Sequence, residues 1–131
     1  PDYLISAATQ LVLAQRLARR SCKECRIPDE DVTPKVLTDL GFSPELASRV
    51  KALKGKGCPK CKDTGYKGRQ GIYEILVVSK PVKEAILRKA TTPELREIAI
   101  KEGFQTMQDM GRRLIANGEL NFREYERVLS S

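Results

Sequence analysis

Apolar residues recur every three or four positions at the start of the chain, the period of an amphipathic helix. These positions are Leu4, Ala8, Leu11, Val12 and Leu17. The last turn of this pattern is rich in arginine, which complements the negative end of a helix dipole. We therefore expect a long N-terminal helix over residues 4–20 that leads into the first pair of cysteines.

A second helical pattern occupies residues 33–50. Thr33-Pro34 and Ser43-Pro44 each place a capping hydroxyl before a proline at the first helical position. Gly41 stands where a glycine would end the first of two short helices. The segment predicts a pair of short helices.

Residues 71–78, GIYEILVV, are rich in β-branched and aromatic residues between turn-forming residues, which predicts a strand. Four short helices are expected after it, because cap residues recur before apolar runs. Their predicted starts are Ser79, Thr92-Pro93, Thr106 and Asn121. The pattern as a whole predicts an α+β fold that is mainly helical, with one or two short strands and a C-terminal bundle of about four short helices.

Composition adds charge to this picture. The 131 residues carry a net charge of +7 and are 40% hydrophobic, which suits a globular protein and permits acidic partners without identifying one. Four tyrosines, three phenylalanines and no tryptophan argue against a base-stacking surface, so no direct nucleic-acid partner is expected. No apolar run approaches the roughly 20 residues that span a bilayer, and no signal-peptide pattern opens the chain. Because the chain begins at Pro1 with a helical pattern soon under way, we expect a fragment of a longer protein.

Four cysteines form the clearest chemical pattern. Cys22 and Cys25 make one C-x-x-C pair, and Cys58 and Cys61 make another, with the predicted helical pair between them. Two such pairs can present four sulfurs in the tetrahedron that zinc prefers, which would leave no position for a catalytic water. We therefore predict structural Zn²⁺ in a sub-domain over residues 22–70. Disulfides, redox-active pairs and unliganded thiols are the alternatives, although disulfides are rare in the cytosol.

Other catalytic patterns are missing from the sequence. There is no histidine, which excludes histidine bases and the Ser-His-Asp triad. Neither G-x-x-x-x-G-K-[ST] nor G-x-G-x-x-G occurs, so the glycines of residues 54–71 do not form a known phosphate-binding loop. The consecutive acids at positions 29–31 and the lone Glu74 make no defensible acid–base pair. We therefore expect no catalytic residue in this chain.

Three motifs resemble the C-terminal domain of the type IV pilus assembly and type II secretion ATPases. They are QRLARRSCKEC, GCPKCKDTGYKGRQGIYE and GFQTMQDMG, and with their surroundings they cover essentially the whole chain. The resemblance implies that residues 1–21 end an ATPase core, that residues 22–70 form a tetracysteine zinc sub-domain, and that residues 71–131 form a strand with a helical region. The nucleotide motifs of that family lie upstream, so ATP and Mg²⁺ would bind only in the full-length parent.

The resemblance also implies partners and a location. The parent would be a cytoplasmic homo-hexamer, peripheral at the bacterial inner membrane, that contacts a platform protein there. This chain would pack on its own ATPase core and on neighbouring subunits. Gln15, Arg16 and Arg69 fall in the matching motifs and are candidates for subunit or nucleotide contacts. The main alternative is a free-standing zinc-ribbon module that binds nucleic acid, and a weaker one is the zinc region of DnaJ-type chaperones.

Overall fold

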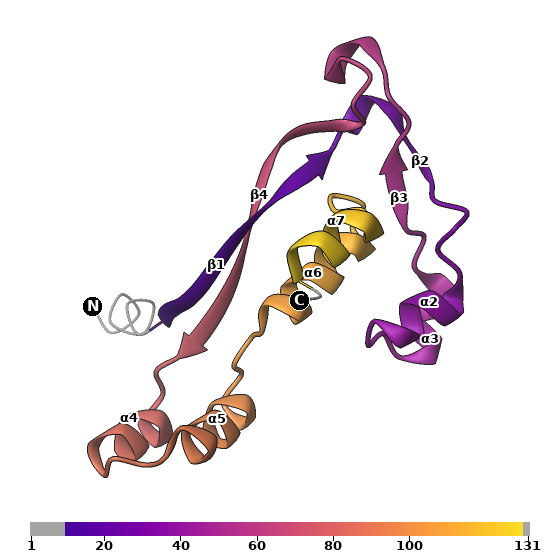
Figure 1. Ribbon diagram of the computed structural model, residues 1–131. Coiled ribbons are helices and arrows are strands. Elements are labelled where there is room, and N and C mark those ends of the chain that lie inside the picture. Colours follow the sequence, from indigo (N-terminus) through magenta and orange to yellow (C-terminus); the bar gives the residue numbers. More distant parts are fainter. Residues whose placement is uncertain (1–9, 130–131) are drawn as a thin grey trace, which may run out of the picture. The chain divides into compact units, whose positions relative to one another are not determined.

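The computed structural model describes residues 10–129 (Figure 1). Within this range the chain forms four strands, two short 3-10 turns and six α-helices. The first half contains β1 (Gln10–Ser21), η1 (Lys23–Cys25), β2 (Arg26–Pro28), α2 (Pro34–Asp39), α3 (Pro44–Arg49), β3 (Leu53–Gly55) and η2 (Pro59–Cys61). The second half contains β4 (Tyr66–Val77), α4 (Lys80–Leu87), α5 (Thr92–Lys101), α6 (Met107–Ala116) and α7 (Phe122–Leu129). The predicted α+β class is confirmed.

The long N-terminal helix is the main error of the sequence prediction. Residues 10–21 form β1, which pairs with β4, and the two strands run in opposite directions (Figure 1); residues 4–9 of the predicted helix lie outside the described range. Val12 and Leu17, two positions of the predicted pattern, are exposed, so the apolar positions do not form one buried helical stripe. A strand partner some fifty residues further along outweighs the local helical spacing.

The strands are also more extensive than expected. The predicted strand at 71–78 begins five residues earlier, at Tyr66, and β2 and β3 bring the number in the described range to four rather than one or two. The two short strands pair antiparallel, with Arg26 opposite Gly55 and Pro28 opposite Leu53.

Gly68 interrupts the regular alternation of β4. In an uninterrupted strand Tyr66 and Gln70 would face the same side. Instead, Tyr66 packs against Arg19, and Gln70 accepts a hydrogen bond from the neighbouring Arg20. Gly68, with φ of +81°, lies between them and allows the local irregularity that redirects the side chains.

The chain divides into two compact units, each described by itself. One joins the chain up to Gln15 with Tyr73–Met107, and the other joins Arg16–Ile72 with the chain from Gln108 onward. In the first unit the core consists of apolar side chains from β4, α4 and α5, with Val78, Leu95, Ile98 and Phe104 around Leu76, Val82 and Ala99. The four predicted C-terminal helices are confirmed as elements, α4 and α5 in this unit and α6 and α7 in the other.

In the second unit, residues 26–57 lie between the two cysteine pairs and are called the insert; its two predicted helices form as expected. Thr33 and Ser43 cap α2 and α3 by accepting from the amides of Val36 and Leu46. Helices α6 and α7 pack closely at Gly111, where an added Cβ would lie 2.6 Å from Leu129 Cδ1. None of the helices in residues 10–129 is long and apolar enough to cross a membrane.

Candidate metal centre

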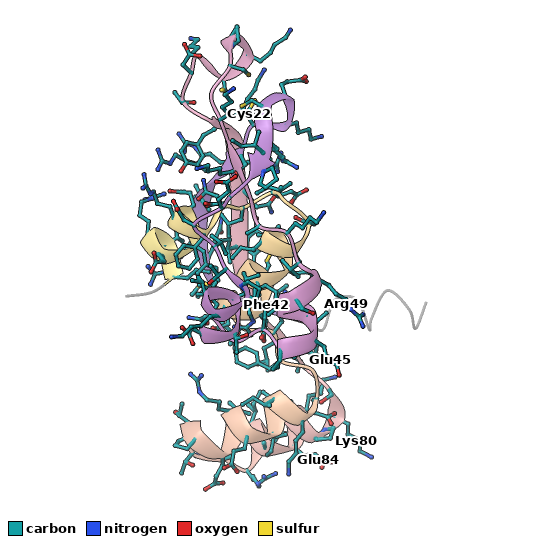
Figure 2. All side chains as sticks on the ribbon, turned by 90° about the vertical axis from the view of Figure 1, so that its right-hand side faces the viewer. Cys22, Phe42, Glu45, Arg49, Lys80 and Glu84 are labelled. Carbon is teal, nitrogen blue, oxygen red and sulfur yellow. The ribbon has the colours of Figure 1, made fainter. Side chains whose placement is uncertain are left out.

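The two C-x-x-C segments form similar 3-10 turns at one end of the β2–β3 ribbon. Cys22 follows β1 and Cys25 ends η1, which together we call knuckle 1; Cys58 precedes η2 and Cys61 ends it, which we call knuckle 2. Between the knuckles, β2 and β3 carry the chain out to the α2–α3 pair and back (Figure 1). Figure 2 shows Cys22 at one end of this ribbon and Phe42 at the other. The insert therefore folds while its two ends stay together.

The four sulfurs lie in one cluster, within 4.8 Å of one another. The Sγ–Sγ distances are 3.8 Å for Cys22 and Cys58, 3.8 Å for Cys25 and Cys61, and 3.7 Å for Cys58 and Cys61. Four sulfurs placed tetrahedrally at 2.3 Å from a common centre would be about 3.8 Å apart. The cluster therefore has the size of a tetrahedral thiolate site for a metal ion.

Backbone amides from glycine-rich segments point at the sulfurs. Gly57 N donates to Cys25 Sγ at 3.3 Å, and Gly65 N donates to Cys61 Sγ at 3.2 Å. Cys58 N also donates to Cys61 Sγ, at 3.2 Å. Gly57 and Gly65 have φ values of +109° and +81°, which residues with a Cβ rarely adopt. The glycines thus aim the amides that stabilise negative charge on sulfur.

Gly55 and Gly65 bring knuckle 2 against knuckle 1. A Cβ on Gly55 would lie 2.0 Å from the carbonyl oxygen of Gly65, an impossible contact. The same Gly65 oxygen accepts from Cys22 N at 2.9 Å, and Lys56 N donates to Cys25 O at 2.9 Å. Two glycines and two main-chain hydrogen bonds therefore hold the cysteine pairs in register.

The thiols of the cluster influence each other's acidity. Burial opposes ionisation of Cys61, but the amides of Cys58 and Gly65 and the neighbouring thiols lower its pKa from 9.0 to about 6. The Gly57 amide lowers the pKa of Cys25, whereas burial and hydrogen bonds with the other three thiols outweigh it and raise the pKa to about 11. Backbone amides thus favour the ionised form of Cys61, the form in which a thiol binds a metal.

A buried carboxylate fastens the base of knuckle 1 to α7. Glu124 is fully buried and accepts from the main-chain amide of Arg19 at 2.7 Å. The guanidinium groups of Arg19 and Arg127 donate to the same carboxylate. Burial raises the pKa of Glu124, but the bonds from Arg127 and Arg19 outweigh it and lower the pKa from 4.5 to about 2.

This arrangement was not foreseen in the sequence. Glu124 follows the predicted helix start Asn121 by three positions, the spacing of a capping box, and Asn121 Oδ1 accepts from Glu124 N at 2.7 Å. The Glu124 side chain, however, binds the two arginines. Asn121 Nδ2 also donates to the Tyr66 hydroxyl at 3.0 Å, and the Tyr66 ring lies 4.1 Å from the Arg19 guanidinium carbon. The contact between Asn121 and Glu124 can be read from sequence spacing, whereas the contacts of these residues with Tyr66 and Arg19 cannot.

Arg112 connects α6 to the insert. Its guanidinium donates to the Leu40 carbonyl oxygen at 3.2 Å and also pairs with Asp109. The backbone of Gly41 packs on the same guanidinium, which an added Cβ would approach to 3.0 Å. The helical pair is thereby anchored to the C-terminal part of its own unit.

The other predicted site residues do not join the cysteine cluster. Gln15, Arg16 and Arg69 are exposed side chains on the two long strands. Their predicted contacts with nucleotide or neighbouring subunits stay predictions.

Comparison with known proteins finds similarity over nearly the whole chain. The family model described as "Type II/IV secretion system protein" matches residues 1–127. The chain is 35% identical over 122 residues to the type IV pilus assembly ATPase PilB of Myxococcus xanthus, a match that covers 93% of this chain and 22% of that protein. It is 41% identical over 112 residues to PilB of Thermus thermophilus, covering 83% of this chain and 12% of that protein.

A secretion protein matches to a similar degree. The type II secretion system protein HxcR of Pseudomonas aeruginosa is 32% identical over 126 residues, which cover 96% of this chain and 23% of HxcR. The chain thus spans less than a quarter of the length of each of these three relatives.

Proposed function

Because the chain belongs to the type II/IV secretion system protein family, we propose that it is the C-terminal structural and coupling part of a hexameric ATPase that powers pilus assembly or type II secretion. Its four cysteines hold a structural zinc ion. The observation that carries the zinc proposal is the sulfur spacing of 3.7–3.8 Å, which fits a tetrahedron of Zn–S bonds.

The donor set favours zinc among the biological metals. Four thiolates select soft or borderline ions, and tetrahedral sulfur coordination is typical of zinc or iron. All four positions are filled by protein sulfurs, so the bound ion has a structural role rather than that of a water-activating catalyst. The amides of Gly57, Cys58 and Gly65 offset part of the net charge of about −2 on such a centre.

Zinc also compensates for a small hydrophobic core around the knuckles. The buried apolar side chains of the insert are Leu37, Phe42, Ala47 and Ala52, and they gather on and next to the helical pair rather than at the knuckles. Metal binding stabilises comparable small units by on the order of 10 kcal/mol. Zinc thus takes the place of a second core at the tip of the β2–β3 ribbon.

The coupling role follows from what the metal centre adjoins. Cys22 directly follows β1, and Arg19, three residues earlier, is bonded to Glu124 of α7. A rigid zinc centre therefore fixes the end of β1 relative to α7 within the same unit. We propose that this rigid unit transmits force between the ATPase core, neighbouring subunits and an inner-membrane platform protein. Gln15, Arg16 and Arg69 are the exposed candidates for contacts with subunits or nucleotide.

Nucleic-acid binding fits less well. Tyr66 follows the lysine-rich knuckle 2 in the sequence. Its ring packs on Arg19, and its hydroxyl is hydrogen-bonded to Asn121. It is therefore occupied within the fold rather than free to stack on a base. Binding of this chain to single-stranded DNA, weakened steeply by salt, would revive that alternative.

The proposal can be tested in the intact parent protein. Replacing the cysteine equivalent to Cys58 with serine should preserve nucleotide binding by the upstream core but abolish pilus assembly or secretion. The matched control replaces exposed Lys60, two residues away in the same knuckle, with alanine and should retain motor output. Full motor output from the serine variant would overturn the coupling role.

A further inference from the structure

The four sulfurs of the cluster differ in exposure. Cys22 is fully buried and Cys61 is 5% exposed, whereas Cys25 and Cys58 are partly open to solvent. A small oxidant in solution therefore reaches Cys25 and Cys58 more readily than the other two.

They also differ in the amides that withdraw electron density. Cys61 Sγ accepts two amide hydrogen bonds, from Cys58 and Gly65, and Cys25 Sγ accepts one from Gly57. Cys58 Sγ accepts from the amide of Cys61 across the 3-10 turn. In the described range, no backbone amide donates to Cys22 Sγ. Because such bonds reduce the nucleophilicity of sulfur, Cys22 is the strongest nucleophile of the cluster once ionised.

All four sulfurs lie within 4.8 Å of one another, so exposure and amide bonding distinguish the close pairs. Cys58 Sγ lies 3.8 Å from Cys22 Sγ and 3.7 Å from Cys61 Sγ. Cys25 Sγ lies 3.8 Å from Cys61 Sγ, whose two amide donors make it a poor attacking group. Among these close pairs, Cys58 with Cys22 joins a solvent-accessible sulfur to one that receives no amide hydrogen bond from the described residues.

We propose that Cys58 is a peroxide-sensitive modification site that forms a disulfide with Cys22 and releases the metal ion. The inference rests on the proposed zinc site. In the first step the Cys58 thiolate attacks one oxygen of hydrogen peroxide, the O–O bond breaks, and sulfenic acid and hydroxide form. In the second step the Cys22 thiolate attacks the Cys58 sulfur and displaces a second hydroxide. Two thiolates thus lose two electrons in total, and one peroxide is reduced.

The position of this disulfide gives it a specific consequence. It joins knuckle 1 to knuckle 2, whereas a disulfide within either C-x-x-C pair would leave the knuckles unconnected. When the metal leaves, the disulfide would therefore take over its role of holding the two knuckles together. It would close the loop between Cys22 and Cys58, which are 36 positions apart. A thiol reductant together with zinc should then restore the original centre.

The test uses the 131-residue chain loaded with zinc. Zinc content is measured first, so that failure of the metal site itself is seen before any oxidant is added. One equivalent of hydrogen peroxide is then added, zinc release is followed with a chromogenic chelator, and free thiols are alkylated. Trypsin cuts after Lys23, Arg26, Lys56 and Lys60, which places each cysteine in its own peptide. Disulfide partners can then be read directly by mass spectrometry.

The expected result is zinc release together with a dominant Cys22–Cys58 cross-linked peptide. A zinc-loaded chain that keeps its metal and its four thiols would overturn the inference. So would dominant linkage within a pair, Cys22 to Cys25 or Cys58 to Cys61.

Two serine variants, each lacking one of the four proposed metal ligands, test whether Cys22 is the thiol that attacks Cys58. Cys25→Ser retains the proposed pair and should still form the Cys22–Cys58 disulfide with peroxide. Cys22→Ser should instead accumulate sulfenic acid on Cys58, detected as a mass adduct with a 1,3-dione probe. Equal sulfenic acid at Cys58 in both variants would contradict the assignment of Cys22 as the attacking thiol.

Discussion

The main-chain amide of Arg19 donates to one carboxylate oxygen of Glu124 at 2.7 Å, and the guanidinium of the same arginine donates to the other at 2.9 Å. The two residues are 105 positions apart in the sequence. The Arg19 amide lies on the edge of β1 that does not pair with β4. The Glu124 carboxylate accepts its hydrogen bond there, as the carbonyl of a neighbouring strand would. The fold thereby joins β1, the strand that leads to the cysteine cluster, to α7.

Glu124→Gln should lower the free energy of unfolding by about 2 kcal/mol or more, because it leaves two arginines without their buried counter-charge. Urea denaturation followed by circular dichroism measures this loss. Glu30→Gln, at an exposed position, is the control and should change stability by less than about 0.5 kcal/mol. Equal stability of the two variants would show that the Arg19–Glu124 contact contributes nothing measurable.

The same carboxylate predicts a pH dependence. The folded-state pKa of Glu124 is about 2, below its ordinary value of 4.5, so the unfolded chain takes up a proton first as the pH falls. The stabilisation from Glu124 is therefore complete above about pH 4.5 and is lost as the pH falls toward 2. Measured between these values, the stability of Glu124→Gln should fall less steeply than that of the unmodified chain. Parallel pH profiles would contradict the assignment.

Arg112→Ala should destabilise the second unit by about 1–2 kcal/mol, because the Leu40 carbonyl loses a donor and Asp109 loses its charged partner. Hydrogen exchange should become faster at the end of α2. Arg113→Ala changes the adjacent, exposed arginine of α6 and should have little effect. If both variants behave alike, Arg112 does not anchor the insert.

Gly55→Ala should weaken zinc binding by at least about tenfold, or about 1.4 kcal/mol. The added Cβ would lie 2.0 Å from the Gly65 carbonyl oxygen, so the knuckles must move apart. Competition with a zinc chelator measures the affinity, and Lys56→Ala, exposed and next in sequence, is the control. Unchanged affinity in Gly55→Ala would mean that the close glycine contact does not set the sulfur geometry.

Local signals in the sequence were sufficient for the helices after residue 33 and for the grouping of the four cysteines. The Thr33 and Ser43 caps formed as predicted, because a hydroxyl before a proline acts within one helical turn. The cysteine spacing was equally local: each C-x-x-C pair makes its own turn, and only the meeting of the turns depends on the fold.

Long-range contacts account for what the sequence did not reveal. Val12 and Leu17 fit a helical period but belong to a strand, because pairing with β4 cannot be seen from their neighbours. Glu124 lies at a capping-box spacing, but Arg19 and Arg127 compete successfully for its carboxylate. The need for glycine at position 55 likewise appears only when Gly65 is brought against it.

The metal content of the purified 131-residue chain tests the central claim most directly. Mass spectrometry of the native protein, together with elemental analysis, should find one zinc ion per chain. Removing this ion by chelation should unfold residues 22–70, while the amide signals of α4 and α5 in the NMR spectrum are retained. A chain that is folded over residues 22–70 with no bound metal and four free thiols would contradict the account.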